Sequence, residues 1–172
     1  IRLLDPAAGS GHMLTYAFDL LVKIYEEEGH APSEIPSLIL RHNLYGLEIC
    51  PRATQLAQFA LVCKAREYAR AAFRNPVQPQ VMCLQDVVFD DDELQNFSST
   101  VHCPLSTVHL KQLHQFHENT STFGSLIQPV LTTDEIAALK AKIGDVAPSG
   151  DLLFQDTHRK ICRALDQAEM LS

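Results

Sequence analysis

The sequence has no CxxC pair and no long apolar run, and each absence excludes a class of protein. No apolar stretch approaches the roughly 18–20 residues that span a bilayer, so we expect no membrane segment. Five cysteines are scattered along the chain, which fits reduced thiols in the cytoplasm better than disulfides or a zinc site. There is no initiator methionine and no signal peptide, and we expect the chain to be an excised piece of a larger protein.

The charge balance argues against nucleic-acid binding by this segment alone. Asp and Glu number 21 against 14 Lys and Arg, a formal net charge of -7. A protein that holds DNA through its overall field carries the opposite sign. Arg66, Arg70 and Arg74 form a helical stripe that we interpret as a solvated face, with contact to a DNA backbone as the alternative. We predict no metal site, because only His114 and His117 share a helical face and no second ligand pair follows.

Residues 1–90 alternate between short apolar runs and helical patterns. The runs 1–4, 43–49 and 81–84 are typical of buried parallel strands. A helix is expected after the glycines at 9 and 11, with Gly29 as its cap, and another from Pro51. A short helix is expected to begin near Ser33. We expect these two long helices to bury apolar faces, the first Met13, Ala17, Leu20, Leu21 and Ile24, the second Leu56, Phe59, Ala60 and Cys63.

This alternation predicts an α/β fold, a partial Rossmann-like core of three parallel strands with helices. The pattern changes after residue 90. Residues 108–118, 132–143 and 151–172 are expected to be helical, and no fourth strand is visible. We therefore predict an α/β half-domain over 1–90 and a mainly helical segment over 91–172.

An acidic residue lies at the end of each expected strand or just after it. These residues are Asp5, Glu48 and Asp86. In open parallel sheets, ligands bind outside the carboxyl ends of the strands. The three carboxylates are therefore expected to meet at one edge of the sheet, where they would favour a cationic ligand.

The segment DPAAGSGH, residues 5–12, places a glycine-rich turn between the first strand and the first helix. Such a turn lets the backbone approach a ligand and presents free amides to it. The dinucleotide fingerprint is not met, because Leu14 stands where a third glycine or alanine belongs, and no Gly-Lys-Ser/Thr follows as in a P-loop. A carboxylate directly before the turn suits S-adenosylmethionine, which carries a sulfonium and an ammonium group.

DPAAGSGHM closely resembles the first motif of gamma-type N6-adenine DNA methyltransferases. NLYGLEICPRATQLAQFAL, residues 43–61, resembles their second motif region. Together with YEEEGHAPSEIPSLIL and TFGSLI (122–127), these segments look most like the BREX phage-defence methylases of the PglX type. The resemblance covers most of residues 1–130 and is most specific in residues 1–65.

The resemblance implies a binding site for S-adenosylmethionine. Glu48 would accept the ribose hydroxyls, Ile49 would pack on the adenine face, and Asp86 would accept the adenine amine. That last match is weaker, because Gln85 stands where the family often has glycine. His12 could touch the ligand or serve in helix-start packing. The methionine end of the cofactor would lie against the loop formed by Asp5, Pro6, Ala7, Ala8, Gly9, Ser10 and Gly11.

The sequence also departs from the family. The catalytic Asn/Asp-Pro-Pro-aromatic motif does not occur in these 172 residues, since the one Asn-Pro, Asn75-Pro76, continues with Val77. We therefore expect no catalytic residue in this fragment and no activity from it alone. The complete protein is expected to bind duplex DNA mostly through other parts, to work with defence-system subunits and to reside in a bacterial or archaeal cytoplasm. The fragment itself is expected to associate through the exposed edge of its first strand, or to cover that edge with its C-terminal helices.

Three other functions stay open at this point. One is a non-catalytic module that binds S-adenosylmethionine or serves as a scaffold. Another is a methyltransferase for protein, RNA or a small molecule, which the amino-acid sequence of the glycine loop disfavours. An NAD-dependent oxidoreductase is more distant still, because the fingerprint fails.

Overall fold

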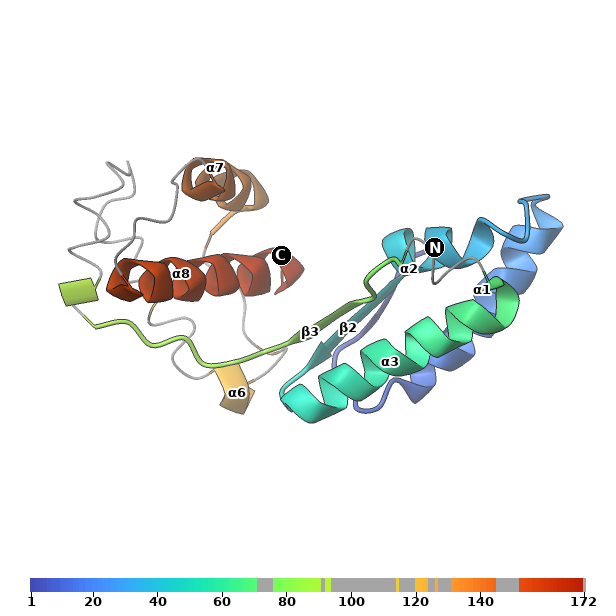
Figure 1. Ribbon diagram of the computed structural model, residues 1–172, viewed down its shortest axis with the longest axis horizontal. Coiled ribbons are helices and arrows are strands. Elements are labelled where there is room, and N and C mark those ends of the chain that lie inside the picture. Colours follow the sequence, from blue (N-terminus) through green and yellow to red (C-terminus); the bar gives the residue numbers. More distant parts are fainter. Residues whose placement is uncertain are drawn as a thin grey trace. The chain divides into compact units, whose positions relative to one another are not determined.

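The structure is a computed structural model that describes residues 1–70, 76–90, 92–93, 114, 120–123, 126, 131–144 and 152–171. The chain divides into two compact units, 1–84 and 85–172. Each unit has its own secondary-structure elements (Figure 1). Whether the functional boundary lies near residue 90, as predicted, stays a prediction.

The first unit is built on a parallel sheet of three strands, β1 (Leu3–Asp5), β2 (Leu44–Glu48) and β3 (Gln80–Cys83). Their order in the sheet is β1-β2-β3, the order of the sequence. Leu3 pairs with Leu44 and Gly46 with Val81. The predicted α/β fold, a partial Rossmann-like core with three parallel strands, is confirmed. Within the described residues, β1 is an edge strand that pairs with β2.

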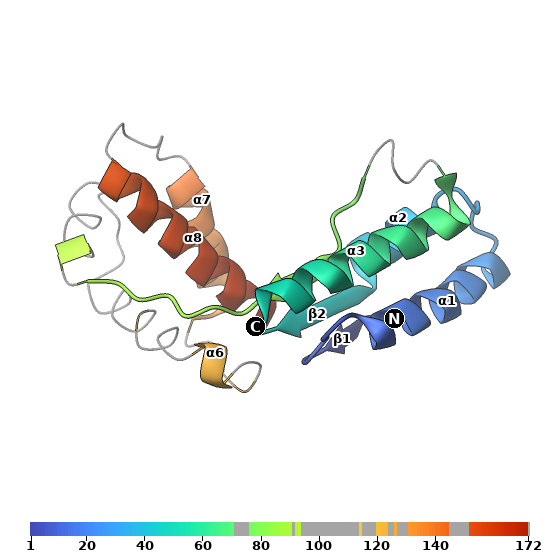
Figure 2. The ribbon, with the colours of Figure 1, turned by 60° about the horizontal axis from the view of Figure 1, so that its bottom comes forward.

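The helices described in the first unit include α1 (His12–Glu27), α2 (Ile35–His42) and α3 (Pro51–Tyr68). With the strands in sequence order, right-handed crossovers place α1 and α3 on the same face of the sheet. Figures 1 and 2 show these two helices lying along one another over the strands. The predicted helix signals hold, because Pro51 opens α3 and Gly29 follows the C-cap of α1 with φ 82°.

The predicted apolar face of α1 is wrong by part of a turn. Met13, Leu20 and Ile24 are exposed, at 65%, 45% and 40% of their surface. Apolar residues lie on more than one side of this helix, so spacing alone does not identify the side that meets the sheet. The side chains that α1 does bury are Leu14, Ala17, Phe18, Leu21 and Val22.

The predicted face of α3 is also wrong. Leu56 and Phe59 are exposed, whereas the buried residues of α3 are Thr54, Ala57, Leu61 and Ala65. Three of these four are small, so α3 can approach the chain beneath it closely. Leu56 and Phe59 thus stay exposed although large apolar side chains are usually buried, whereas Leu61 is the large apolar residue that α3 buries.

Two polar networks tie the elements of the first unit together. At the amino end of the sheet, the buried Asn43 accepts from Tyr25 Oη at 2.9 Å and donates to the Ile1 carbonyl at 2.6 Å. Between α1 and α3, Asp19 accepts from Tyr68 Oη at 2.7 Å and pairs with Lys64 at 3.0 Å. Partial burial opposes ionisation of Asp19, but these hydrogen bonds outweigh it and lower the pKa of its carboxyl.

The second unit contains a separate apolar core formed between α7 (Thr133–Gly144) and α8 (Leu152–Leu171). Ile136, Ile143, Ile161 and Leu165 are each at most 2% exposed. A capping box begins α7, since Thr132 N donates to Glu135 Oε2 at 2.9 Å and Glu135 N donates to Thr132 Oγ1 at 3.4 Å. The helical predictions over 132–143 and 151–172 are thus confirmed.

Other parts of the second unit bear less directly on the sequence predictions. Thr122 and Phe123 belong to the short helix α6 (Thr120–Phe123), and the exposed Leu126 follows it. The rest of 122–127 and all of 108–118 except His114 lie outside the described residues. None of the described helices has the length and apolar character of a bilayer-spanning segment.

The burial pattern of α1 gives a test with two neighbouring leucines. Leu21→Ala removes a side chain that is 5% exposed, and we expect a loss of about 2–5 kcal/mol in the free energy of unfolding. Leu20→Ala makes the same chemical change at a position that is 45% exposed, so the expected loss is below about 1 kcal/mol. Urea unfolding of both variants, followed by circular dichroism, measures the difference. A larger loss for Leu20→Ala would restore the face that the sequence predicted.

Candidate functional site

The glycine loop lies at the carboxyl ends of β1 and β2, where the sequence predicted a ligand site. It is anchored to the sheet, because Ala8 N donates to the Leu47 carbonyl at 2.9 Å. Gly11 N then donates to the Ala8 carbonyl at 2.8 Å, which closes the turn directly before α1. Ala7 N bonds to Asp5 Oδ1 at 3.2 Å, so the aspartate shapes the start of the same loop.

Glu48 is the group that joins the loop to the strands. Its Oε2 accepts from Gly9 N at 2.7 Å, and its Oε1 accepts from Ile49 N and Cys50 N, each at 2.9 Å. The backbone carbonyl of Glu48 accepts from Leu84 N at 2.7 Å, directly after β3. One residue thus fixes the glycine loop, the start of α3 and the end of β3.

Small residues let the loop approach the sheet and α3. Gly11 has φ 84°, and a Cβ built there would lie 3.0 Å from both Cα and Cβ of Ala57. Gly46 is equally crowded, with Leu14 Cδ1 at 3.0 Å and Ala8 Cβ at 3.2 Å from a Cβ built on it. Sequence reasoning assigned no role to Gly46 or Ala57. A glycine inside a strand is the signal for Gly46, since it marks close approach of another segment.

The side chains around the loop have the chemistry that a cationic, partly apolar ligand needs. Asp5 and Glu48 supply two carboxylates, and Ile49 exposes half of its surface next to Glu48. Gly9 has φ 54° and nothing within 4 Å of where a Cβ would stand, so the backbone there is open to a ligand. The first amides of α1 add donors for an anionic group. These residues fit a molecule with an ammonium, a carboxylate and a ring.

The structure brings most of the predicted site residues together. Asp5 and the loop residues Pro6, Ala7, Ala8, Gly9, Ser10 and Gly11 lie in one turn beside Glu48 and Ile49. Asp86 is exposed and lies two residues after Leu84, within the second unit. Its predicted contact with an adenine amine therefore stays a prediction.

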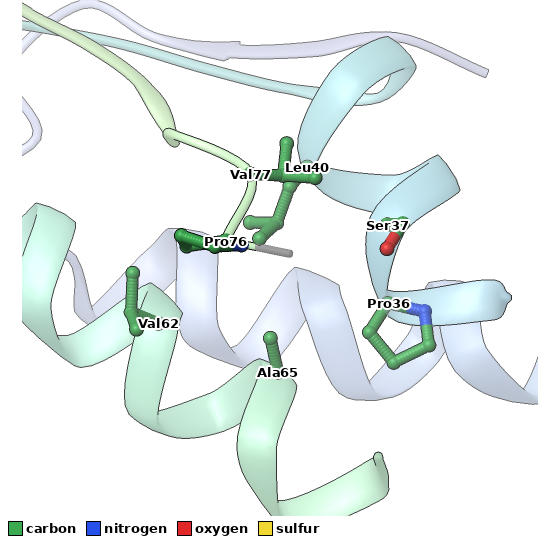
Figure 3. Close-up of a pocket in the computed structure, with 7 residues that line it drawn as sticks. All are labelled: Pro36, Ser37, Leu40, Val62, Ala65, Pro76 and Val77. Atoms are coloured by element: carbon green, nitrogen blue, oxygen red, sulfur yellow. The ribbon is translucent and has the colours of Figure 1, made fainter. Parts of the chain in front are cut away.

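An apolar hollow elsewhere in the first unit has a different character (Figure 3). Its wall is formed by α2, α3 and the segment before β3, with Ser37 as the polar residue. α2 leads into β2, and Pro76 and Val77 lead into β3. The hollow therefore lies at the amino end of the sheet, away from the glycine loop. Its lining contains no charged side chain: it consists of Pro36, Ser37, Leu40, Val62, Ala65, Pro76 and Val77.

The histidines near residue 114 and the arginine stripe that begins at Arg66 do not form a site among the described residues. His114 Nδ1 accepts from Phe89 N at 3.1 Å, so this histidine has a structural partner. His109 and His117 lie outside the described residues, and no group of three His, Cys, Asp or Glu suited to a metal occurs within them. Arg66 is exposed on α3 and Arg70 is exposed just after it, while Arg74 lies outside the described residues.

Comparison with known proteins gives a clear relationship. No protein-family model matches the chain. The adenine-specific methyltransferase BrxX of Escherichia coli O9:H4 (strain HS) is 32% identical over 195 residues, which cover 100% of this chain and 16% of BrxX. The adenine-specific methyltransferase PglX of Lacticaseibacillus casei (strain Zhang) is 42% identical over 98 residues, 57% of this chain and 8% of PglX.

The chain therefore spans less than a fifth of the length of the curated relatives it matches. The resemblance predicted from the sequence is confirmed, because both relatives are named adenine-specific methyltransferases and one is PglX itself. The match to BrxX includes the whole chain, so the helical second unit has a counterpart there as well as the glycine loop.

The crowding at Gly11 gives a test with a matched control. Gly29→Ala places a Cβ in open space at φ 82°, so we expect only the cost of a left-handed backbone, about 1–2 kcal/mol. Gly11→Ala has nearly the same φ but adds contacts at 3.0 Å with Ala57, so its loss should be clearly greater. Thermal and urea unfolding of the two variants measure this difference. Equal losses would show that Ala57 and the loop are less tightly packed than described.

The carboxylate of Glu48 gives a second test. In Glu48→Gln, the amide NH₂ must face either Gly9 N–H or the Ile49 and Cys50 N–H groups, and donor then meets donor. We expect a loss of about 1–3 kcal/mol in the free energy of unfolding. Glu27→Gln makes the same change at an exposed position in the last turn of α1, where about 0.5 kcal/mol or less is expected. Similar effects in the two variants would contradict the joining role of Glu48.

Proposed function

We propose that this chain, a homologue of a segment of the adenine-specific methyltransferases, binds S-adenosylmethionine at the glycine loop. The proposed contacts are the ones that the sequence resemblance implied. Asp5 and residues 6–11 hold the methionine end, Glu48 the ribose, Ile49 the adenine face and Asp86 the adenine amine. The observation that carries the proposal is the glycine loop fastened by Glu48 at the carboxyl edge of the sheet.

The hydrogen bonds of Glu48 refine the ribose contact. A carboxylate offers about four acceptor positions, and backbone amides use three of them here. The free position belongs to Oε2, because Oε1 already accepts two bonds. One ribose hydroxyl therefore fits without disturbing the loop, and a second would have to share or replace an existing bond. We propose a single direct hydroxyl contact to Glu48 Oε2.

The complete protein is proposed to be an N6-adenine DNA methyltransferase of a phage-defence or restriction-modification system in a prokaryotic cytoplasm. S-adenosylmethionine supplies the methyl group when bound. This chain orients that cofactor, and a flipped-out adenine would be held by other parts of the complete protein. Duplex DNA and other defence-system subunits are proposed to contact mainly other parts of the protein. The fragment alone is therefore expected to be inactive.

Two alternatives make different predictions for the complete protein. A scaffold module that binds the cofactor without catalysis would lack an Asn-Pro-Pro-Tyr sequence downstream of this segment. A methyltransferase for a non-DNA substrate would leave duplex DNA unmethylated in an assay with radiolabelled cofactor. The names of the two relatives favour a methyltransferase that acts on adenine, since each is called an adenine-specific methyltransferase.

Calorimetric titration of the 172-residue chain tests the cofactor directly. We expect heat of binding with S-adenosylmethionine and none with NAD. Asp5→Asn removes a negative charge beside a cationic ligand, and the expected affinity is at least about tenfold weaker. Asp134→Asn, an exposed change in the second unit, is the control and should bind as the parent chain does. A folded chain that binds NAD but not S-adenosylmethionine would contradict the proposal.

A further inference from the structure

Ser10 and His12 form a hydrogen-bonded pair within the glycine loop. Ser10 Oγ lies 2.8 Å from His12 Nδ1. The serine is half-buried, and the histidine ring is exposed at the first position of α1. Ser10 belongs to the proposed binding loop, whereas His12 has no role in it so far. A histidine that is bonded to a loop hydroxyl can decide which way that hydroxyl points.

The backbone around this pair is firmly held. Gly11, between the two residues, packs against Ala57 of α3. The His12 carbonyl accepts from Thr15 Oγ1 at 2.9 Å, and Thr15 N donates to the Gly11 carbonyl at 2.9 Å. The Ser10–His12 contact is thus a short-range bond on a fixed turn, and its direction depends on the protonation of the imidazole.

We infer that His12 is a positioning residue that sets the Ser10 hydroxyl as an acceptor for the ammonium group of the cofactor. With Nδ1 unprotonated, Ser10 donates its proton to His12, and both lone pairs of Oγ stay available to a ligand. With the imidazole protonated, Nδ1–H donates to Ser10, and the serine proton turns away from the ring. Ser10 Oγ then keeps one lone pair for the ligand instead of two, and the imidazolium adds a positive charge beside the ammonium group. This inference rests on the proposed function.

The charged groups near the turn do not produce the same effect. Asp5 Oδ1 and Glu48 Oε2 accept backbone amides of the loop. On α3, the residue that meets the turn is Ala57, and the charged residue of the first helical turn is Arg52. Asp19 on α1 is engaged by Lys64 and Tyr68. Histidine is the side chain here that ordinarily changes its charge between pH 5 and 8.

The experiment measures the affinity of the 172-residue chain for S-adenosylmethionine at pH 7.5 and pH 5.5. We expect the parent chain to bind about tenfold more weakly at pH 5.5, the combined effect of a weakened hydrogen bond and an added like charge. His12→Asn places an acceptor near the position of Nδ1 that does not titrate, so it should keep its affinity at both pH values. Ser10→Ala should bind weakly at both. His42→Asn, an exposed histidine at the end of α2, should retain the pH dependence of the parent chain.

A second measurement keeps the inference separate from the proposed function. Long-range ¹H–¹⁵N NMR of the histidine side chains, without cofactor, should show His12 at pH 7.5 with its proton on Nε2. A proton on Nδ1 at that pH would overturn the inference, whatever the chain binds. Equal pH dependence in His12→Asn and the parent chain would also overturn it while leaving S-adenosylmethionine binding intact. Failure of the parent chain to bind at pH 7.5 would instead refute the proposed function.

Discussion

The arrangement of the first unit depends on the hydrogen bonds that the Glu48 carboxylate accepts. Gly9, Ile49 and Cys50 donate to its two oxygens, and its backbone carbonyl receives Leu84 N. A charged acceptor forms stronger hydrogen bonds to amides than a neutral one. The loop, the start of α3 and the end of β3 are thereby joined at one residue. A side chain proposed to bind a ligand is, before any ligand arrives, part of the framework.

The backbone of the first unit could be predicted from the sequence because its signals are local. Pro51 opens a helix, Gly29 ends one, and the acidic residues mark strand ends whatever the rest of the chain does. The buried faces could not be predicted in the same way. Met13 and Leu20 have the right spacing, yet the sheet lies under Leu14 and Leu21. Which side of a helix is buried depends on its neighbours, and small residues such as Ala57 decide how close those neighbours come.

The site shows the same division between local and distant information. The glycine loop, Asp5 and Glu48 could be predicted from motif and position. The hydrogen bond from Gly9 to Glu48 and the crowding of Gly46 and Gly11 could not, because they join residues 32 or more positions apart. The family resemblance implied that Glu48 binds the ribose. In the structure, three of its acceptor positions are already used by hydrogen bonds from backbone N–H groups. Asp86 follows the strand as expected, and its role at the site stays a prediction.

The strand order of the first unit has a consequence for how the protein is made. Because β1, β2 and β3 neighbour one another in the order of the sequence, each strand joins an edge that already exists. No strand has to be inserted between two others. Each βαβ unit can therefore close by adding its last strand to an existing edge, and the contacts of the Glu48 carboxylate involve no residue after Cys50. The order of assembly can therefore follow the order of the sequence in this part of the chain.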